Sequence, residues 1–512
     1  KPIYPQAFAL LGMKGVPCTP YAVPGTDGVP ESVSPGILRP PLVRLVNAGP
    51  LSDSTQPLVF RVDGDDPVDP ESFRLLVDRT NLTASLVRDG LVWRLSGRNW
   101  SPGAHRCEIR IADIGGDWYY ATKVFWFGEA PRTPKVTLRE DGMTLVDGKP
   151  FFPIGAYAIC RREFNGNNLD RAFADLKAAG FNLGHSYYSD RDPEFYAAAG
   201  RHGMKLWVNA REVTSREGDA WLADVGRGNP SILAWYLGDD TSDNSTVAAM
   251  FNRGDSVRAL DGTRLTCQAD GVLNGEGGAV EDGRSRYADY VDCTDVFMPE
   301  IYSLIKSENE TACVARVVRD MELAKVDMVR RGCGVRKGLW PVLQHFRGYG
   351  HWERYPTLAE QEAMTMAAIV HGANGIIWYT YGGSVKSGNY GLCATPEAWM
   401  TITNVSRRLA AHMDVLQSVP ASRQPVLEVQ GGPKYDFYGN PSVTMLRKDL
   451  DGYAYVFAVN ATKTAVKVGF SAPSSEGCLV SDLGCPPIQV DRGFVIDVFS
   501  GFATRIYRFR IE

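Results

Sequence analysis

The stretch SILAWYLGDDTSD, residues 231–243, is an apolar, β-favouring run that ends in two adjacent aspartates, Asp239 and Asp240. Such a run, bounded by polar residues, is typical of a strand that is buried on both faces of a parallel sheet. The two aspartates allow two interpretations. They could cap a following helix, because acidic and hydroxyl side chains satisfy the free amides at a helix start. They could also be catalytic carboxylates at the end of a barrel strand.

Seven further runs share this pattern, namely FFPIGAYAI, FNLGHSYYS, KLWVNARE, RLTCQAD, DVFMPEIY, GLWPVLQHF and GIIWYTYGG. Segments with helical spacing of apolar residues, such as LDRAFADLKAAG and LAEQEAMTMAAIVHG, lie between them. Because parallel strands need helical crossovers, eight strands in roughly 250 residues predict an α/β chain built on a (β/α)8 TIM barrel. A doubly wound sheet is the alternative, but it would usually carry a glycine-rich phosphate loop after its first strand. The sequence has none there.

The chain on either side of the barrel region is rich in strands. Residues 1–130 begin with a segment rich in Pro and Gly and continue with short alternating strands, which predicts an N-terminal immunoglobulin-like β-sandwich. Residues 131–419 would hold a linker and the barrel. Residues 420–512 return to alternating strands and predict a C-terminal β-sandwich. Several domains are expected because 512 residues exceed what one hydrophobic core usually supports.

The charge balance argues against polyanionic partners. The chain has 55 basic and 59 acidic residues and a formal net charge of -4, so it lacks the basic surface of a nucleic-acid binder. No apolar run approaches the roughly 20 residues that a membrane-spanning helix needs. We therefore expect a small or neutral ligand and no nucleic-acid or membrane partner. The oligomeric state is not specified by the sequence.

The cysteines and glycosylation triplets bear on the compartment. Ten cysteines are scattered without CxxC pairs, and the spacing of Cys478 and Cys485 suits a disulfide across a hairpin, although two free buried thiols would give the same pattern. Six Asn-x-Ser/Thr triplets are compatible with export. These features favour a secreted, periplasmic or cell-surface location. No HExxH or similarly spaced cluster occurs, and we expect neither a metal nor another cofactor.

Ligands bind at the carboxyl ends of the strands in a barrel of this type. The residues that end the predicted strands are Tyr157, His185, Tyr187, Asn209, Arg211, Glu212, Asp239, Asp240, Gln268, Asp270, Glu300, Tyr302, Gln344, His345, Trp378 and Tyr381. Carboxylates, amides and aromatic rings gathered at one mouth suit a sugar, because hydroxyls need polar partners and the C–H faces of a sugar stack on rings.

From residue 147 to about residue 419, a series of motifs occurs in order and at suitable spacing. They are VDGKPFFPIGAY, AAGFNLGHSYY, GMKLWVNAR, ILAWYLGDDTS, VFMPEIY, PVLQHF and HGANGIIWYTY. Together they resemble the clan A glycoside hydrolases, in particular bacterial barrels that open with a DGKPFFPIG segment and carry a WYLxDEP fourth strand. The resemblance covers about half of the chain. It implies a barrel that acts on glycosidic bonds.

The resemblance also implies roles for the two aspartates. In that clan the residue ending strand four is the acid/base carboxylate, and an amide before it holds a sugar hydroxyl; these positions fall on Asp240 and Asp239. Both depart from the pattern, since Asp replaces the usual Glu and a carboxylate replaces the usual Asn. Two nearby carboxylates disfavour ionising together, so one of the two pKa values should rise, as a general acid requires.

Strand seven departs further from the clan pattern. Retaining members place a nucleophilic Glu there, whereas this chain has Gln344 and His345. The second carboxylate would therefore come from another strand, with Glu300 as first candidate, followed by Asp270 and Glu212. A separation of roughly 6.5–9.5 Å from Asp240 would imply inversion and roughly 5–5.5 Å retention. The missing nucleophile favours inversion.

The remaining strand ends are predicted to bind the substrate. The resemblance places a ring hydroxyl at Tyr302 and a sugar-stacking ring at Trp378, and the loop RGYGHWERYP adds Trp352 at the rim. Packing inside the barrel is the alternative for His185 and the tryptophans. The predicted substrate-binding residues are His185, Tyr187, Asn209, Arg211, Glu212, Asp270, Tyr302, Gln344, His345, Trp352, Trp378 and Tyr381.

The sequence thus predicts a glycoside hydrolase that cleaves an oligo- or polysaccharide with carboxylate acid/base catalysis. The catalytic candidates are Asp240, Glu300 and Asp239. The alternative is a catalytically inactive carbohydrate-binding barrel that kept the cleft and lost the strand-seven carboxylate.

Overall fold

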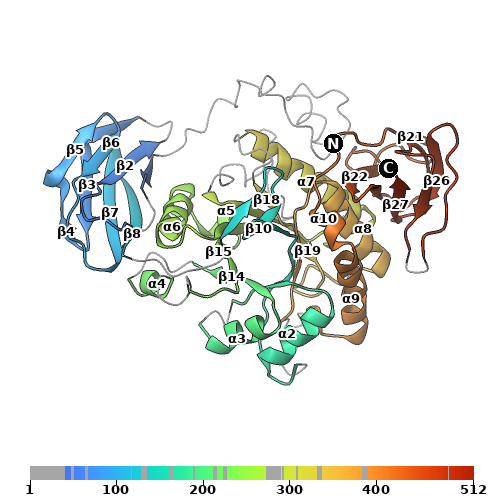
Figure 1. Ribbon diagram of the computed structural model, residues 1–512, viewed down its shortest axis with the longest axis horizontal. Coiled ribbons are helices and arrows are strands. Elements are labelled where there is room, and N and C mark those ends of the chain that lie inside the picture. The colour runs from blue at the N-terminus through green and yellow to red at the C-terminus, as the bar shows by residue number, and fades with distance from the viewer. Residues whose placement is uncertain are drawn as a thin grey trace.

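The structure is a computed structural model with a central barrel between two all-β units (Figure 1). It describes residues 41–47, 51–63, 67–116, 118–128, 135–161, 165–187, 191–210, 216–222, 226, 228–271, 290, 293–306, 310–330, 337–382, 390–481 and 484–511. The N-terminal sheets lie at one end of the molecule and the last strands at the other (Figure 1). Each unit has a hydrophobic core of its own.

The barrel predicted from the sequence is confirmed. Its strands are β12 (Ile154–Ala156), β13 (Leu183–Gly184), β14 (Lys205–Asn209), β15 (Ile232–Gly238), β16 (Leu265–Gly271), β17 (Val296–Ile301), β18 (Gly338–Leu339) with β19 (Val342–Gln344), and β20 (Ile376–Tyr379). Neighbouring strands are parallel, and the pairing of β16 with β17 closes the ring. Strand seven is divided into β18 and β19 around Pro341, which has no N–H for the ladder.

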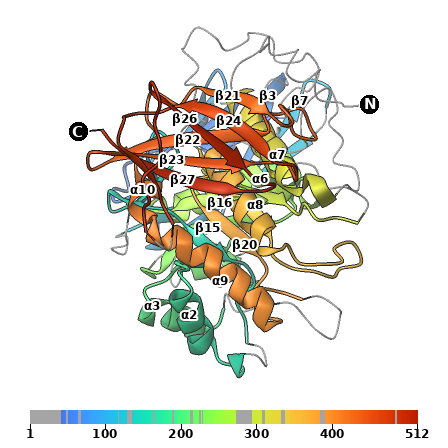
Figure 2. The same cartoon turned by 90° about the vertical axis from the view of Figure 1, so that its right-hand side faces the viewer.

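Helices follow the strands and cover the outside of the barrel (Figures 1 and 2). They are α2 (Leu169–Ala178), α3 (Pro193–Arg201), α4 (Arg216–Trp221), α5 (Thr241–Asn244), α6 (Val247–Leu260), α7 (Cys313–Arg330), α8 (Leu358–Val370), α9 (Pro396–Ala411) and α10 (Met413–Gln417). A capping box of Thr357 and Glu360 starts α8, as its sequence dictates. No helix in the described ranges is long and apolar enough to cross a membrane.

The alternation of side chains along each strand separates two buried layers. Trp207, Tyr236 and Val296 belong to the cluster inside the barrel. Trp235 and Trp378 belong to the cluster between strands and helices. The parity of a residue within its strand therefore decides whether its side chain can reach the barrel axis.

A small antiparallel sheet covers the amino-terminal end of the barrel. It consists of β9 (Val136–Leu138), β10 (Thr144–Val146) and β11 (Lys149–Phe151). Val136 is part of the interior cluster, and Phe151 packs against that cluster. The Val136 amide also bonds to the Thr263 carbonyl just before β16, at 2.8 Å. This sheet therefore covers the amino-terminal end of the barrel, opposite the strand ends that carry the predicted site residues.

The N-terminal sandwich predicted from the sequence is confirmed. One sheet contains β1 (Leu42–Leu45), β2 (Leu58–Asp63), β6 (Val92–Leu95) and β5 (Leu86–Asp89); the other contains β4 (Thr80–Asn81), β3 (Val68–Val77), β7 (Gly103–Asp113) and β8 (Trp118–Phe127). Phe73 and Trp93 stack between the sheets with ring centroids 4.2 Å apart.

The C-terminal sandwich predicted from the sequence is also confirmed (Figure 2). One sheet contains β22 (Val443–Leu450), β23 (Tyr453–Asn460), β27 (Thr504–Arg510) and β25 (Gly477–Leu479); the other contains β21 (Leu427–Gly431), β24 (Val466–Ser471) and β26 (Phe494–Phe499). Phe470, Phe499 and Phe509 are buried between them. We propose that the chain consists of three domains, which comprise residues 1–130, 131–419 and 420–512.

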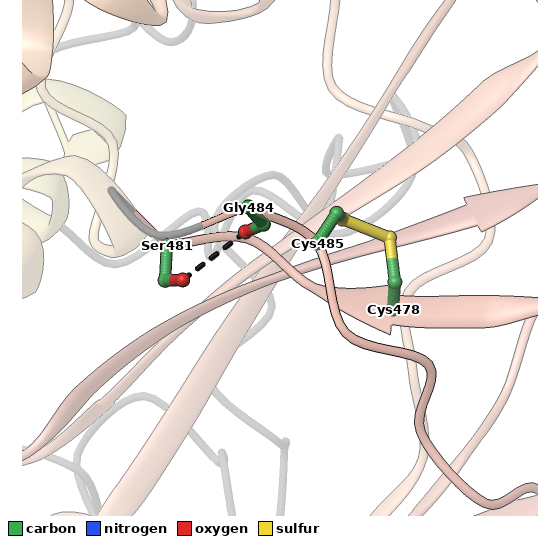
Figure 3. The surroundings of a disulfide bond; sticks show 4 residues. All are labelled: Cys478, Ser481, Gly484 and Cys485. Carbon is green, nitrogen blue, oxygen red and sulfur yellow. Dashed lines mark hydrogen bonds between the residues drawn. A yellow bond between two sulfur atoms is a disulfide. The ribbon is translucent and has the colours of Figure 1, made fainter.

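The expected cross-link between Cys478 and Cys485 is present in the C-terminal sandwich (Figure 3). The two Cα atoms are 5.3 Å apart, and the Ser481 hydroxyl donates to the Gly484 carbonyl at 3.1 Å within the same turn. Of the glycosylation triplets, the one at Asn460 is closed to modification in the folded chain. Its side chain is fully buried and its amide donates to two backbone carbonyls.

A buried lysine joins the N-terminal sandwich to the barrel. Lys123 on β8 is 1% exposed, and its Nζ donates to Asn252 at 3.0 Å and to Asp255 at 2.9 Å, both on α6. A buried ion pair is stable only while both charged side chains are present. Loss of the Lys123 ammonium group would therefore remove this cation from the carboxylate of Asp255.

Replacing Lys123 tests this junction. We expect Lys123→Met to lower the free energy of unfolding by about 2–4 kcal/mol, because the partly buried carboxylate of Asp255 loses its nearer cation and keeps Arg258, at 3.6 Å. Urea unfolding measures the change, and Lys467→Met on an exposed position of β24 is the control. Equal stability of the two variants would contradict the role of Lys123.

Candidate active site

The inward-facing positions at the carboxyl ends of the strands form the candidate site. Strand parity and ring contacts place the following side chains there: Tyr157, His185, Tyr187, Asn209, Tyr236, Glu300, Tyr302, Gln344 and Tyr379. Their chemistry is dominated by phenols and carboxyl groups. Asp239 and Asp240 join them directly after β15.

Asp239 is held by two tyrosines. The Tyr187 hydroxyl donates to Asp239 Oδ2 at 3.0 Å, and the Tyr236 hydroxyl donates to Asp239 Oδ1. The hydroxyls of Tyr157 and Tyr236 lie 2.9 Å apart. Burial, and next the charge of Asp239, raises the pKa of both Tyr187 and Tyr236 well above its usual value. These phenols therefore remain protonated and act as donors.

Asp240 occupies the N-cap position of α5 but does not cap it. Its side chain makes no capping hydrogen bond, and its backbone is in the left-handed region, with φ 45° and ψ 52°. Asp tolerates this region better than most residues, and the Gly238 before the pair leaves no room for a Cβ atom beside Thr241. The tight turn directs the carboxyl group of Asp240 to Glu300, with which it forms a hydrogen bond.

Glu300 is the most buried of the three carboxyl groups of Asp239, Asp240 and Glu300. It lies at the end of β17 and is 6% exposed. Burial, followed by the charges of Asp239 and Asp240, raises the pKa of Glu300 well above its usual value. Burial therefore favours the protonated form of Glu300, which can donate the hydrogen bond to Asp240.

Asp270 supports this arrangement from the helix-facing side of β16. It accepts hydrogen bonds at 2.9 Å from the Thr241 hydroxyl and from both the amide and the hydroxyl of Ser242. Burial raises the pKa of Asp270 to about 6, against these hydrogen bonds. The side chain is 2% exposed and anchors the turn after Asp240, so its predicted contact with substrate does not fit its position.

Aromatic rings line the site beside Glu300. Tyr302 packs against Phe346, Trp352 and Tyr379 with ring centroids 5.0, 5.8 and 5.7 Å apart. Tyr349, which is 38% exposed, extends this wall toward solvent. Its ring centroid lies 6.3 Å from that of Tyr379. Trp352 is tied to the strand-six exit by a hydrogen bond from its indole N–H to the Tyr302 carbonyl at 3.4 Å. Tyr302 and Trp352 therefore belong to one aromatic cluster, and their contact with a substrate stays a prediction.

Three predicted substrate contacts lie on the wrong side of their strands. Trp378 is fully buried and packs on Phe181, away from the barrel axis. His345 bonds to Gln361 on α8 at 2.7 Å and to the carbonyl of Ala398 on α9 at 2.9 Å. Tyr381 is 1% exposed and belongs to the same outer layer. These side chains fill the space between barrel and helices, which corrects the roles predicted for them.

The strand-seven amide faces the barrel axis but is bound to the backbone. Gln344 accepts a hydrogen bond from the Leu304 amide at 2.9 Å and donates to the Phe346 carbonyl at 3.2 Å. It therefore braces the exits of strands six and seven. His185 stacks on Trp207 with ring centroids 5.0 Å apart, and it is fully buried.

Two predicted residues, Arg211 and Glu212, lie outside the described residues, while Asn209 ends β14 on the inward side. The sequence analysis did not assign roles to Tyr236 or Tyr379. The alternation of side chains along a strand could have identified them. Tyr236 lies two positions before Gly238 and Tyr379 lies two positions after Ile377, so each faces the barrel axis. Within the described part of the chain, no three His, Cys, Asp or Glu side chains are arranged to hold a metal ion.

Comparisons with known proteins give distant structural matches. No known family model and no curated protein sequence matches the chain. A family 39 glycoside hydrolase from the gut symbiont Bacteroides cellulosilyticus WH2 is 13% identical, with 91% of this chain and 100% of that chain covered and a TM-score of 0.44. A β-glucuronidase from Parabacteroides merdae is 12% identical, with 93% and 75% covered and a TM-score of 0.36.

An α-amylase from Geobacillus thermoleovorans is 12% identical, with 70% of this chain and 98% of that chain covered and a TM-score of 0.44. The three matched proteins are thus a family 39 glycoside hydrolase, a β-glucuronidase and an α-amylase. At this level of similarity, we base the functional proposal on the geometry of the site alone.

The raised pKa of Asp270 gives a testable pH dependence. Between its usual 3.8 and about 6, the folded state binds more protons than the unfolded state, so this group destabilises the fold as pH rises through that window. Asp270→Asn cannot lose this proton. We therefore expect the Tm of the wild type minus that of the variant to decrease from pH 4 to pH 7 in calorimetry.

The control for this measurement is Asp89→Asn, whose side chain is 84% exposed. Its Tm difference from the wild type should stay constant over the same range. A constant or increasing difference for Asp270→Asn would show that burial does not govern this carboxyl group.

Proposed function

We propose that the chain is a glycoside hydrolase that cleaves glycosidic bonds of an oligo- or polysaccharide. The observation that carries the proposal is the hydrogen-bonded pair of Asp240 and Glu300 beside Asp239, at the carboxyl end of a closed barrel. Glycoside hydrolysis needs one carboxyl group that is protonated and one that is ionised near the same bond. The different surroundings of these groups provide both states.

The acid is the pair of Asp240 and Glu300. Glu300 holds the proton, and Asp240 is the more exposed of the two. The proton passes through Asp240 to the glycosidic oxygen while the bond from that oxygen to the anomeric carbon breaks. A water molecule then adds to the anomeric carbon and returns its proton to Asp240, which restores the pair. Glu300 thus supplies the proton, and Asp240 delivers it to the leaving group.

Asp239 is the charged partner in this mechanism. Its two phenol donors favour the carboxylate form, because hydrogen bonds to the charged form stabilise it. A fixed negative charge at this position stabilises the positive charge that develops on the sugar ring. Tyr302, Trp352 and Tyr379 offer ring faces and edges for sugar C–H groups nearby.

The contact between Asp240 and Glu300 bears on stereochemistry. Inversion by this pair would require a water molecule between groups roughly 6.5–9.5 Å apart. A direct hydrogen bond leaves no such space. The inversion favoured by the sequence therefore does not fit Asp240 and Glu300, which act here as one acid.

The location and the accessory units complete the proposal. The disulfide of Cys478 and Cys485 supports a secreted, periplasmic or cell-surface protein, since disulfides persist in oxidising compartments. Such a protein would meet polysaccharides directly. The two sandwiches brace the barrel on opposite sides (Figure 1).

A second candidate function is carbohydrate binding without hydrolysis. The observation that favours it is Gln344, which stands at the usual nucleophile position and is bound to the backbone. This barrel would keep the aromatic wall and the polar mouth and lack turnover. The following experiment distinguishes hydrolysis from binding without hydrolysis.

Asp240→Asn distinguishes the two functions. We expect the wild type to hydrolyse at least one member of a panel of aryl glycosides and polysaccharides, and the variant to lose about 10²–10⁴-fold in kcat, because the acid is gone. Binding of the same sugar, measured by calorimetry, should persist. The control is Asp170→Asn on the surface of α2, which should keep full activity.

Binding without turnover in the wild type across the whole panel would support the second function. Full activity of Asp240→Asn would exclude Asp240 as the acid.

A further inference from the structure

We propose that Tyr236 and Tyr187, backed by Tyr157, are positioning residues that hold Asp239 as the ionised carboxylate of the site. This inference rests on the proposed function for its catalytic meaning. It assigns a role to three tyrosines from three different strands of the barrel. The sequence analysis named Tyr157 only among the residues that end the predicted strands and did not assign a role to Tyr236.

The contacts that carry the proposal all converge on one carboxyl group. Tyr187 donates to Asp239 Oδ2 at 3.0 Å, and Tyr236 donates to Asp239 Oδ1. Both side-chain oxygens of Asp239 therefore act as acceptors. A proton on either oxygen would compete with one of these two phenols, so the arrangement fits the carboxylate and not the acid.

Tyr157 extends this arrangement by one phenol. Because the Tyr236 hydroxyl gives its proton to Asp239, its oxygen accepts from the Tyr157 hydroxyl at 2.9 Å. Consecutive hydrogen bonds polarise each other in the same direction, which strengthens the terminal bond to the carboxylate. Tyr157 and Tyr236 are fully buried, so water does not replace them readily.

Rigid packing keeps the phenols in place. The ring of Tyr157 contacts His185, Trp207 and Tyr236, with centroids 5.1, 5.0 and 6.1 Å apart. His185 in turn contacts Tyr187 at 4.6 Å. The buried His185, which is 0% exposed, thus acts as a spacer between the three phenols.

As a consequence, the negative charge and the proton are held on different carboxyl groups of the site. Asp239 and Asp240 are adjacent, yet Asp239 faces donors whereas Asp240 faces the protonated Glu300. The phenols thereby prevent the proton of Glu300 from settling on Asp239. The groups whose charge or hydroxyl acts with Asp239 are Tyr157 after β12, Tyr187 after β13, Tyr236 on β15, Glu300 on β17, Tyr302 after β17 and Tyr379 on β20.

The test is the pH profile of Tyr236→Phe and Tyr187→Phe. Each variant removes one donor and keeps the ring, so Asp239 should become protonated at higher pH. We expect the acidic limb of kcat/KM to move up by about one pH unit in each variant. At neutral pH, kcat should fall at least 10-fold while KM changes little. Tyr157→Phe should shift the limb in the same direction by less.

The matched control is Tyr507→Phe in the C-terminal sandwich. Tyr507 is also buried and donates to a carboxylate, Asp497, at 2.6 Å. It should leave the pH profile unchanged. A loss of activity in Tyr236→Phe without any shift of the acidic limb, or an equal shift in Tyr507→Phe, would overturn the proposal.

A second measurement does not depend on activity. We expect Tyr236→Phe to lower the Tm at pH 7 more in the wild type than in the Asp239→Asn background, because the lost donor then faces no charge. In the wild type, this loss should shrink at pH 4. Equal losses in both backgrounds at both pH values would overturn the proposal. If the wild type hydrolyses no glycoside, the proposed function fails while these Tm values still decide whether the phenols hold a charged Asp239.

Discussion

Three carboxyl groups, those of Asp239 and Asp240 after β15 and of Glu300 on β17, lie together at the carboxyl end of the barrel, and the site is arranged around their mutual repulsion. Charges that are close together in a medium of low dielectric constant repel strongly, which favours protonation of one group. Glu300 is the most buried of the three and its pKa is raised well above the usual value, whereas Asp239 has phenol donors that compensate its charge. Removing the phenols or exposing Glu300 would erase this difference between the groups.

The barrel brings the three carboxyl groups together and also fixes their positions. Parallel strands deliver Glu300 from β17 and the Asp239–Asp240 pair from β15 to the same end. The sheet of β9, β10 and β11 covers the opposite end. Asp270 holds Thr241 and Ser242, the first two residues of α5, and so anchors the turn that follows Asp240 although α5 has only four residues.

The sequence predicted the architecture well because each strand is a local apolar run. The barrel strands, the two flanking sandwiches and the disulfide were all anticipated. The site was predicted less completely, because a residue at a strand end is shared between two faces. Trp378 and His345 point to the helices, and Tyr379 occupies the inward position that the analysis gave to Trp378. The phenol contacts of Asp239 join residues far apart in the chain, and no local pattern reveals them.

The most direct test of the account is the protonation state of Glu300 at neutral pH. Infrared difference spectroscopy of the wild type against Glu300→Gln detects the band of a protonated carboxyl group. We predict that this band is present in the wild type at pH 7 and absent from the variant. A wild-type spectrum in which this position contributes only carboxylate bands at pH 7 would contradict the shared acid of Asp240 and Glu300.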